Sequence, residues 1–220
     1  MTNVALFDMN ETTLDLVDVR ATVNDILSNP SGFTIWFQKL LQMAMTSAAA
    51  DTYQDFTVLA PSALRTVAAS QQVVLPDDAV PRMGAALGGI APFPDVVAGL
   101  ETLRAAGWTT IALTNSALPS VTAQVENSGL TPLFDHIVSV DMVQQYKPQP
   151  KVYRYGIELG GASVENTWMV ACHDWDLHGA RAQGLQTAYV ARPHMDYADT
   201  YPQPEVFVND FVELAAALVS

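Results

Sequence analysis

The sequence contains a single cysteine, Cys172, so no disulfide can form within the chain. An unpaired cysteine is typical of a reducing compartment, and we therefore expect a cytoplasmic protein. The four histidines and this cysteine do not follow the short, paired spacing of a zinc site.

Basic residues are also scarce, with 10 Lys and Arg against 23 Asp and Glu and a formal net charge of −13. Nucleic-acid surfaces need clustered Lys and Arg, and anionic membranes attract basic segments. No apolar run approaches the ~18 residues of a transmembrane helix, and the N-terminus shows no basic region followed by a cleavable apolar segment. We expect neither nucleic acid nor a membrane as a partner.

Half of the 220 residues are hydrophobic, which is enough for a substantial core. The first apolar run, residues 4–7, is long enough for a short buried strand and ends at Asp8. Ligands bind at the carboxyl ends of strands in α/β sheets, so we expect Asp8 at the floor of a site. This stretch alone leaves three roles open for Asp8: a structural carboxylate, a metal ligand or a nucleophile.

The segment 15–91 differs from the rest of the chain in its periodicity. Apolar residues recur with helical spacing over 36–44 and 59–68, and no alternating segment stands out. From Pro92 onward, patterns typical of strands and helices alternate. We expect strands at 108–113, 136–140, 167–171, 187–191 and 206–208, with helices between them and a closing helix at 212–218.

Strands separated by helices predict an α/β fold with a doubly wound parallel sheet. The expected domains are a core of residues 1–14 and 92–220 and an inserted helical cap of residues 15–91. Polar clusters follow three of the expected strands, at 8–12, 114–116 and 172–176, and Lys147 lies in a loop before Pro148. Because the carboxyl ends of neighbouring parallel strands converge, these clusters are expected to face one another.

The order of these motifs resembles the haloacid dehalogenase superfamily over nearly the whole chain, and most closely its type II 2-haloacid dehalogenases. Phosphatases of the superfamily use a second Asp and further acidic magnesium ligands, and this chain has Asn10 and Cys172 at two of those positions. The resemblance therefore implies a hydrolase without metal or cofactor that acts on short halogenated carboxylic acids. A magnesium phosphatase and a non-catalytic relative stay open as alternatives. The oligomeric state also stays open, a homodimer included.

The resemblance further implies roles for the matching residues. Asp8 would displace the halide and form an ester, and water would then attack the ester carbonyl. Lys147 would keep Asp8 ionised, and Asp176 would hold Lys147. Hydrogen bonds and substrate contacts are expected from Thr12, Thr114, Asn115, Tyr153, Asn10 and Glu11.

Three departures from the family pattern stand out: Glu11 occupies a position that is usually Gly, Ala171-Cys172-His173 replaces the usual Ser-Ser-Asn, and the third concerns the substrate carboxylate. Phe37 stands where an Arg on an early cap helix usually binds it. Either Arg20 takes over this role or no arginine does. In the second case Trp36 and Phe37 would form an apolar wall, while Asn115, Ser116 and main-chain N–H groups would bind the acid.

Two residues compete for the role of the base that activates water. Asp176 is expected to pair with Lys147, which would lower its pKa and make it a poor base. His173 has an unperturbed pKa of ~6.5, which suits proton abstraction near neutral pH. Glu11 or Asp174 would orient its second ring nitrogen. We therefore expect His173 to activate the water, with Asp176 as the alternative.

Overall fold

The first strand, β1 (Val4–Phe7), lies at the centre of a six-stranded parallel sheet in the computed structural model, which describes residues 3–220. β1 pairs with β4 (Thr109–Thr114) on one side and with β6 (Thr167–Ala171) on the other. The full order is β5-β4-β1-β6-β7-β8, completed by β5 (His136–Ser139), β7 (Gln186–Val190) and β8 (Val206–Val208). A central strand covered on both faces needs a continuous apolar run, which explains the first segment of the sequence.

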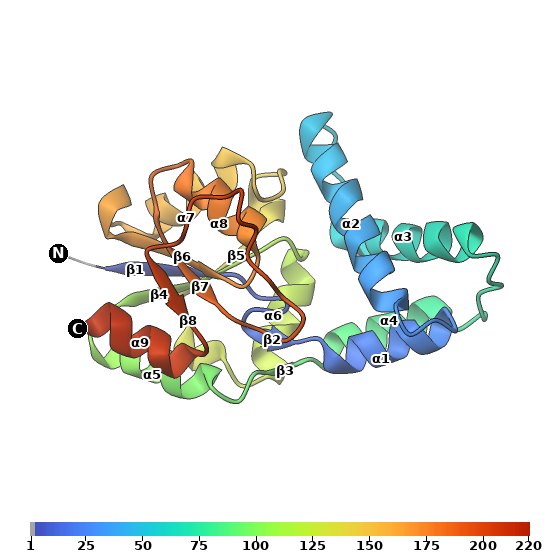
Figure 1. Ribbon diagram of the computed structural model, residues 1–220, viewed down its shortest axis with the longest axis horizontal. Helices are drawn as coiled ribbons and strands as arrows, with labels where there is room; N and C mark the ends of the chain where they lie inside the picture. The colour runs from blue at the N-terminus through green and yellow to red at the C-terminus, as the bar shows by residue number, and fades with distance from the viewer. Residues whose placement is uncertain (1–2) are drawn as a thin grey trace.

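Helices cover both faces of this sheet (Figure 1). α5 (Val96–Ala105) and α9 (Phe211–Val219) pack together on one face, and α7 (Pro150–Gly160) and α8 (Asp174–Arg181) lie on the other. α6 (Leu118–Asn127) packs against β5. The predicted α/β fold with a doubly wound parallel sheet is confirmed, and the expected strands of the sheet agree with the observed ones to within about one residue.

Four helices, α1 (Val17–Ile26), α2 (Gly32–Ala49), α3 (Phe56–Ser70) and α4 (Ala79–Gly88), form the predicted helical insertion. They lie beside the sheet in Figure 1. Two short strands, β2 (Leu14–Asp15) and β3 (Ala91–Pro92), pair antiparallel where the chain leaves and returns. The division into a core of 1–14 and 92–220 and a cap of 15–91 stays a prediction. Within residues 3–220, no helix combines the length and apolar character needed to cross a membrane.

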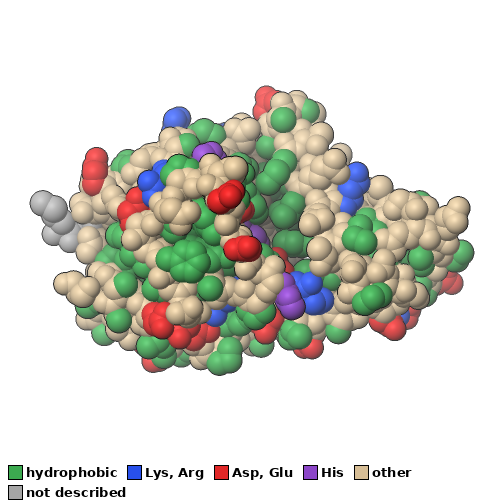
Figure 2. Space-filling model, in the orientation of Figure 1, with side chains coloured by type: hydrophobic (Ala, Val, Ile, Leu, Met, Phe, Trp, Pro, Cys, Tyr) green, Lys and Arg blue, Asp and Glu red, His purple; other side chains and the backbone are tan. Residues whose placement is uncertain are grey.

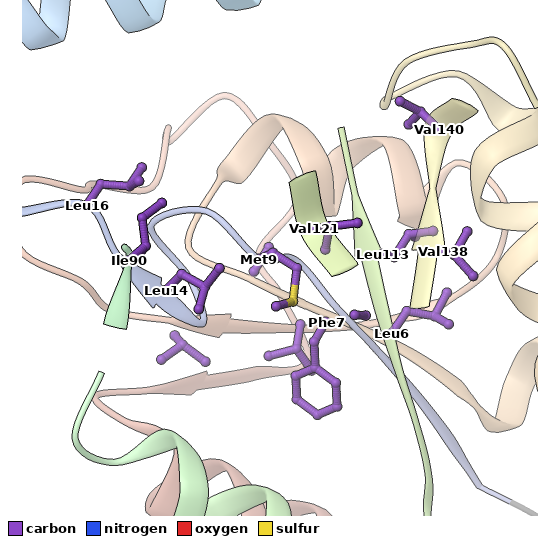
Figure 3. Packing of buried hydrophobic residues seen from close by; sticks show 14 of the residues in the cluster. Leu6, Phe7, Met9, Leu14, Leu16, Ile90, Leu113, Val121, Val138 and Val140 are labelled. Atoms are coloured by element: carbon purple, nitrogen blue, oxygen red, sulfur yellow. The ribbon is translucent and has the colours of Figure 1, made fainter. Parts of the chain in front are cut away.

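The hydrophobic core is continuous from the sheet to the start of the insertion. Figure 3 shows Leu6 and Phe7 of β1 beside Leu113 of β4, and Leu16 and Ile90 where the insertion joins. Each such side chain contributes about 1.5–3 kcal/mol when fully buried. This packing fixes the strand ends that carry the polar clusters.

Candidate active site

Asp8 directly follows β1 and is held in place by its own loop. Its N–H donates to the Val170 carbonyl oxygen (3.0 Å), which continues the pairing with β6. The Thr13 hydroxyl donates to the Asp8 carbonyl oxygen (2.7 Å). Glu11 has φ +63°, an uncommon conformation for a residue other than glycine, and it turns the chain back toward the site. The Asp8 side chain is therefore buried at the carboxyl end of the central strand.

Lys147 connects the two acidic strand ends. Its Nζ donates to Asp8 Oδ1 (2.8 Å), to Asp176 Oδ2 (2.6 Å) and to the Leu113 carbonyl oxygen (2.9 Å). All three ammonium hydrogens are thus used, and the side chain is buried. Burial alone lowers the pKa of Lys147, but the charges of Asp176 and Asp8 raise it above its ordinary value, so the ammonium group stays charged.

The second oxygen of Asp8 is also held. Thr12 Oγ1 donates to Asp8 Oδ2 (2.7 Å), and His173 Nδ1 lies 2.9 Å from the same oxygen. Burial alone raises the pKa of Asp8, but the Lys147 charge and the contacts with His173 lower it well below its ordinary value. The group is therefore held as a carboxylate with both oxygens in contact with neighbouring donors.

His173 lies between two carboxylates. Its Nδ1 faces Asp8, and its Nε2 lies 3.3 Å from Glu11 Oε2. Both partners accept hydrogen bonds when ionised, so these contacts favour the imidazolium form, in which both ring nitrogens carry hydrogen. Burial alone lowers the pKa of His173, but its contacts with Cys172, Asp8 and Glu11 raise it well above the ordinary value. Of the two orienting residues considered, Glu11 contacts the ring, whereas the Asp174 carboxylate accepts from the N–H groups of Trp175 and Ala198.

Asp176 is fully buried and holds Lys147, as expected. Tyr153 donates to its other oxygen, Oδ1 (2.7 Å). The expected lowering of the Asp176 pKa is wrong. Burial raises that pKa, and burial together with the neighbouring charge of Asp8 outweighs the lowering caused by Lys147. The burial of Asp176 could not be predicted from the sequence, and it reverses the direction of the expected pKa shift.

Other predicted residues shape the loops rather than contact Asp8. Asn115 Oδ1 accepts from the Lys147 N–H (2.9 Å), and Thr114 Oγ1 accepts from the Ser116 N–H (3.1 Å). Asn10 Nδ2 donates to Ser116 Oγ (3.1 Å) and so joins the first two loops. These contacts fix the positions of Lys147 and of the start of α6.

The two aromatic residues of α2 face the site differently. The Phe37 ring centroid lies 6.4 Å from that of His173, so Phe37 reaches the cluster around Asp8. Trp36 is buried and donates from Nε1 to the Ala60 carbonyl oxygen (3.0 Å) within the insertion. Both side chains line one cavity beside the site, and Figure 2 shows hydrophobic side chains along the hollow between the sheet domain and the helical insertion.

Arg20 is engaged with protein groups. Its guanidinium contacts Glu11 Oε1 (3.1 Å) and lies over the Phe33 ring (4.2 Å to the centroid). This arrangement favours the second alternative considered for the substrate carboxylate, in which no arginine holds it. A chain of contacts instead runs from Arg20 through Glu11 and His173 to Asp8.

Sequence reasoning missed two roles in this region. The Cys172 N–H donates to Thr12 Oγ1 (3.0 Å), which orients the hydroxyl that holds Asp8. Gln124 lines the cavity, and its amide oxygen is buried without a hydrogen-bond partner among residues 3–220. The contact of the Cys172 N–H could not be predicted, because any residue other than proline has the same main-chain donor. Gln124 could not be predicted either, because a single Gln in a helical segment is usually an exposed polar residue.

The magnesium ion used by related phosphatases does not fit these residues. Within residues 3–220, no group of three or more His, Cys, Asp or Glu side chains is arranged to hold a metal ion. The Lys147 ammonium group fills the space between Asp8 and Asp176, and Cys172 offers sulfur where a hard cation prefers oxygen.

Comparison with known proteins agrees with this geometry. The sequence profile of the haloacid dehalogenase-like hydrolases matches residues 5–190. The chain belongs to this family. Haloacetate dehalogenase H-2 of Moraxella sp. (strain B) is 30% identical over 158 residues, which are 72% of this chain and 70% of that protein. The (S)-2-haloacid dehalogenase of Pseudomonas fluorescens is 26% identical over 218 residues, or 98% of this chain and 96% of that protein.

Solved structures share the fold of this haloacid dehalogenase-like hydrolase. The L-2-haloacid dehalogenase of Xanthobacter autotrophicus, solved with chloropropionic acid covalently bound, superposes with a TM-score of 0.89 at 23% identity. The match covers 99% of this chain and 98% of that one. It therefore includes the helical insertion as well as the sheet.

Proposed function

We propose that this protein is a hydrolytic dehalogenase of 2-haloacids that works through an ester on Asp8. The observation that carries the proposal is the Asp8 carboxylate, kept ionised by Lys147 and fixed at both oxygens by neighbouring groups. The names of the relatives support the same substrate class.

In the first step a carboxylate oxygen of Asp8 attacks the carbon that bears the halogen. A carbon–oxygen bond forms, the carbon–halogen bond breaks, and the halide leaves with the electron pair. Water then attacks the carbonyl carbon of the ester, and the 2-hydroxy acid departs as Asp8 is regenerated. Lys147 lies close enough to stabilise the negative charge that develops on the ester oxygen.

In the proposed mechanism, His173 activates this water. In the free enzyme His173 is an imidazolium held by Asp8 and Glu11, and an imidazolium cannot act as a base. Ester formation removes the negative charge of Asp8, so His173 loses one of the two carboxylates that favour its charged form. It then releases a proton to solvent, takes a proton from the attacking water and returns it to the departing alkoxide oxygen of the 2-hydroxy acid. The second proton of the water, left on the Asp8 carboxyl group, passes to His173 and restores both the carboxylate and the imidazolium.

Labelled water tests whether an ester forms on Asp8, because the position of the incorporated oxygen atom depends on the mechanism. A single turnover in oxygen-18 water should label the Asp8 carboxylate first, and the product should acquire the label only in later turnovers. Asp8→Asn should lose several orders of magnitude in kcat, as expected for a nucleophile. Label that enters the product directly would mean that water attacks the substrate itself.

Halide release and phosphate release separate the proposed function from the two alternatives. Halide release from 2-bromopropanoate should persist after exhaustive EDTA treatment. Phosphate release from phosphoesters that depends on magnesium would support the phosphatase. No turnover in either assay would support a non-catalytic relative.

A further inference from the structure

Glu11 adopts a backbone conformation that glycine reaches more easily, with φ +63°. The residue is only 6% exposed, and its carboxylate lies between two partners. Oε1 is 3.1 Å from Arg20 Nη2, and Oε2 is 3.3 Å from His173 Nε2. A buried carboxylate on a strained backbone next to the site indicates a role for the side chain, since glycine at this position would relieve the strain.

The Glu11 carboxylate does not belong to the reacting groups themselves. Its two oxygens are engaged by Arg20 and His173, and the residue does not line the cavity beside Phe37. Together with Arg20 it lines a separate cavity of about 150 Å³. No bond to Glu11 forms or breaks in the proposed reaction, so its charge stays constant, whereas ester formation removes the charge of Asp8.

This difference between the two carboxylates decides which ring nitrogen of His173 loses its proton. Once Asp8 is an ester, Nδ1–H has lost its ionised acceptor, while Nε2–H still donates to the Glu11 carboxylate. Cys172 also interacts with the ring, but ester formation does not alter its side chain. The proton therefore leaves Nδ1, and the lone pair that remains there faces the ester, because Nδ1 is 2.9 Å from Asp8 Oδ2.

We propose that Glu11 is a positioning residue that keeps hydrogen on Nε2 of His173, so that every proton transfer of ester hydrolysis passes through Nδ1. Nδ1 takes a proton from the attacking water, returns it to the alkoxide oxygen of the 2-hydroxy acid and then receives the second water proton from the Asp8 carboxyl group. Arg20 is a permanent cation that balances the charge of Glu11. This inference rests on the proposed dehalogenase function and assigns a further residue to its second step.

Glu11→Gln tests this assignment with little change in shape. The Arg20 guanidinium has only donors, so the amide oxygen should turn toward Arg20 and the NH₂ group toward His173. Nε2 would then accept a hydrogen bond, and hydrogen would stay on Nδ1, where it blocks the base. We expect kcat to fall by about 100-fold or more while the ester accumulates. Halide release in the first turnover and kcat/KM should stay close to those of the unaltered protein, because Nδ1–H still donates to Asp8.

Removal of Arg20 should partly restore the activity of Glu11→Gln. In the double variant with Arg20→Met, the amide is free to turn its oxygen toward His173 Nε2, so kcat should exceed that of Glu11→Gln alone. A merely structural role of Glu11 predicts the opposite, since a second substitution in one contact would disturb the loop further. Asp174→Asn is the matched control, because this neighbouring carboxylate accepts from main-chain N–H groups and not from the ring. It should keep the kcat of the unaltered protein.

Nitrogen-15 NMR of the His173 ring reports the tautomer without any turnover. Asp8→Ala removes the charge that ester formation removes, and the loss of signals in His173→Asn identifies the ring. In Asp8→Ala the neutral ring should carry its hydrogen on Nε2, and in the double variant with Glu11→Gln it should carry it on Nδ1.

The same tautomer in both NMR samples would overturn the inference. So would an unchanged kcat in Glu11→Gln, or a kcat of its double variant with Arg20→Met that falls further. If the unaltered protein releases no halide from 2-bromopropanoate, the proposed function fails separately. The NMR comparison then still decides whether Glu11 fixes the hydrogen on Nε2.

Discussion

The residue that departs furthest from its expected state is His173. A histidine with an ordinary pKa could act as a base at once, but here two carboxylates hold the ring as an imidazolium. In the proposed mechanism the charge on Asp8 therefore decides whether His173 is an acid or a base. One side chain can in this way stabilise the nucleophile before attack and activate water afterwards.

Removal of His173 should separate the two chemical steps. We expect His173→Ala to release about one equivalent of halide and then stall with the ester intact, because displacement needs no base while hydrolysis does. Rapid-quench halide measurement and the mass of the intact protein would show this burst. Normal multiple turnover by the variant would return the role of base to Asp176.

The raised pKa of His173 also predicts how stability depends on pH. A pKa that is higher in the folded than in the unfolded state stabilises the fold fully below the unfolded value of ~6.5, and the contribution disappears as pH rises through the folded value. The difference in unfolding free energy between the unaltered protein and His173→Asn should therefore shrink as pH increases above ~6.5. A difference that grows with pH would contradict the assigned charge.

Arg20 acts on Glu11 in this structure rather than on a substrate carboxylate. Arg20→Met should slow the acid and its neutral amide by the same factor, because it removes a partner of Glu11 and leaves carboxylate binding unchanged. The measurement is kcat/KM for 2-bromopropanoate and 2-bromopropanamide. A loss confined to the acid would restore Arg20 as the carboxylate-binding residue.

At the scale of helices, α8 approaches the Lys147 loop so closely that only glycine fits. A Cβ atom at Gly179 would overlap the Pro148 ring and lie 2.7 Å from the Tyr153 hydroxyl oxygen. Gly179→Ala should therefore push apart the elements that place Lys147 and Asp176. We expect it to lower the unfolding free energy by about 1–3 kcal/mol and to lower kcat as well.

Gly99 offers a matched control, since a Cβ there would overlap the Phe211 carbonyl group between α5 and α9, away from the site. Gly99→Ala should lower stability by a similar amount and leave kcat unchanged. Equal losses of kcat in both variants would show that the effect of Gly179→Ala is not specific to the Lys147 loop.

Most strands of the sheet domain could be predicted, because strands buried on both faces need continuous apolar runs. Most of its helices could be predicted as well, because glycines mark the ends of several of them. The site could be predicted where polar residues directly follow those runs, as Asp8 and Asp176 do. Asp95 shows the limit. An Asp directly before a helix is typical of a capping side chain, but the Asp95 carboxylate makes no cap on α5 and instead binds Arg192 and the Phe211 N–H, contacts that only the tertiary fold creates. β2 and β3 were not predicted either, because two residues carry no detectable period.

For the whole molecule, the net charge of −13 opposes the approach of an anionic substrate. Added salt screens such repulsion over about 10 Å at 0.1 M ionic strength. KM for 2-bromopropanoate should therefore fall as sodium sulfate is added, while KM for 2-bromopropanamide should stay constant. Sulfate is used because added halide would compete as a product. A parallel fall for both compounds would point to a change in the protein rather than in substrate approach.

The pairing of β2 with β3 places Leu14 next to Pro92, although 77 residues separate them in sequence. The helical insertion therefore begins and ends at one point, and a short turn could join the two strands without disturbing the register of the sheet. An ancestral gene could have gained, lost or exchanged this insertion in one recombination event. The proposed nucleophile and the selectivity for substrate would then have separate histories, since Asp8 and Lys147 lie in the sheet domain, and Phe37 and most of the cavity wall lie in the helical insertion.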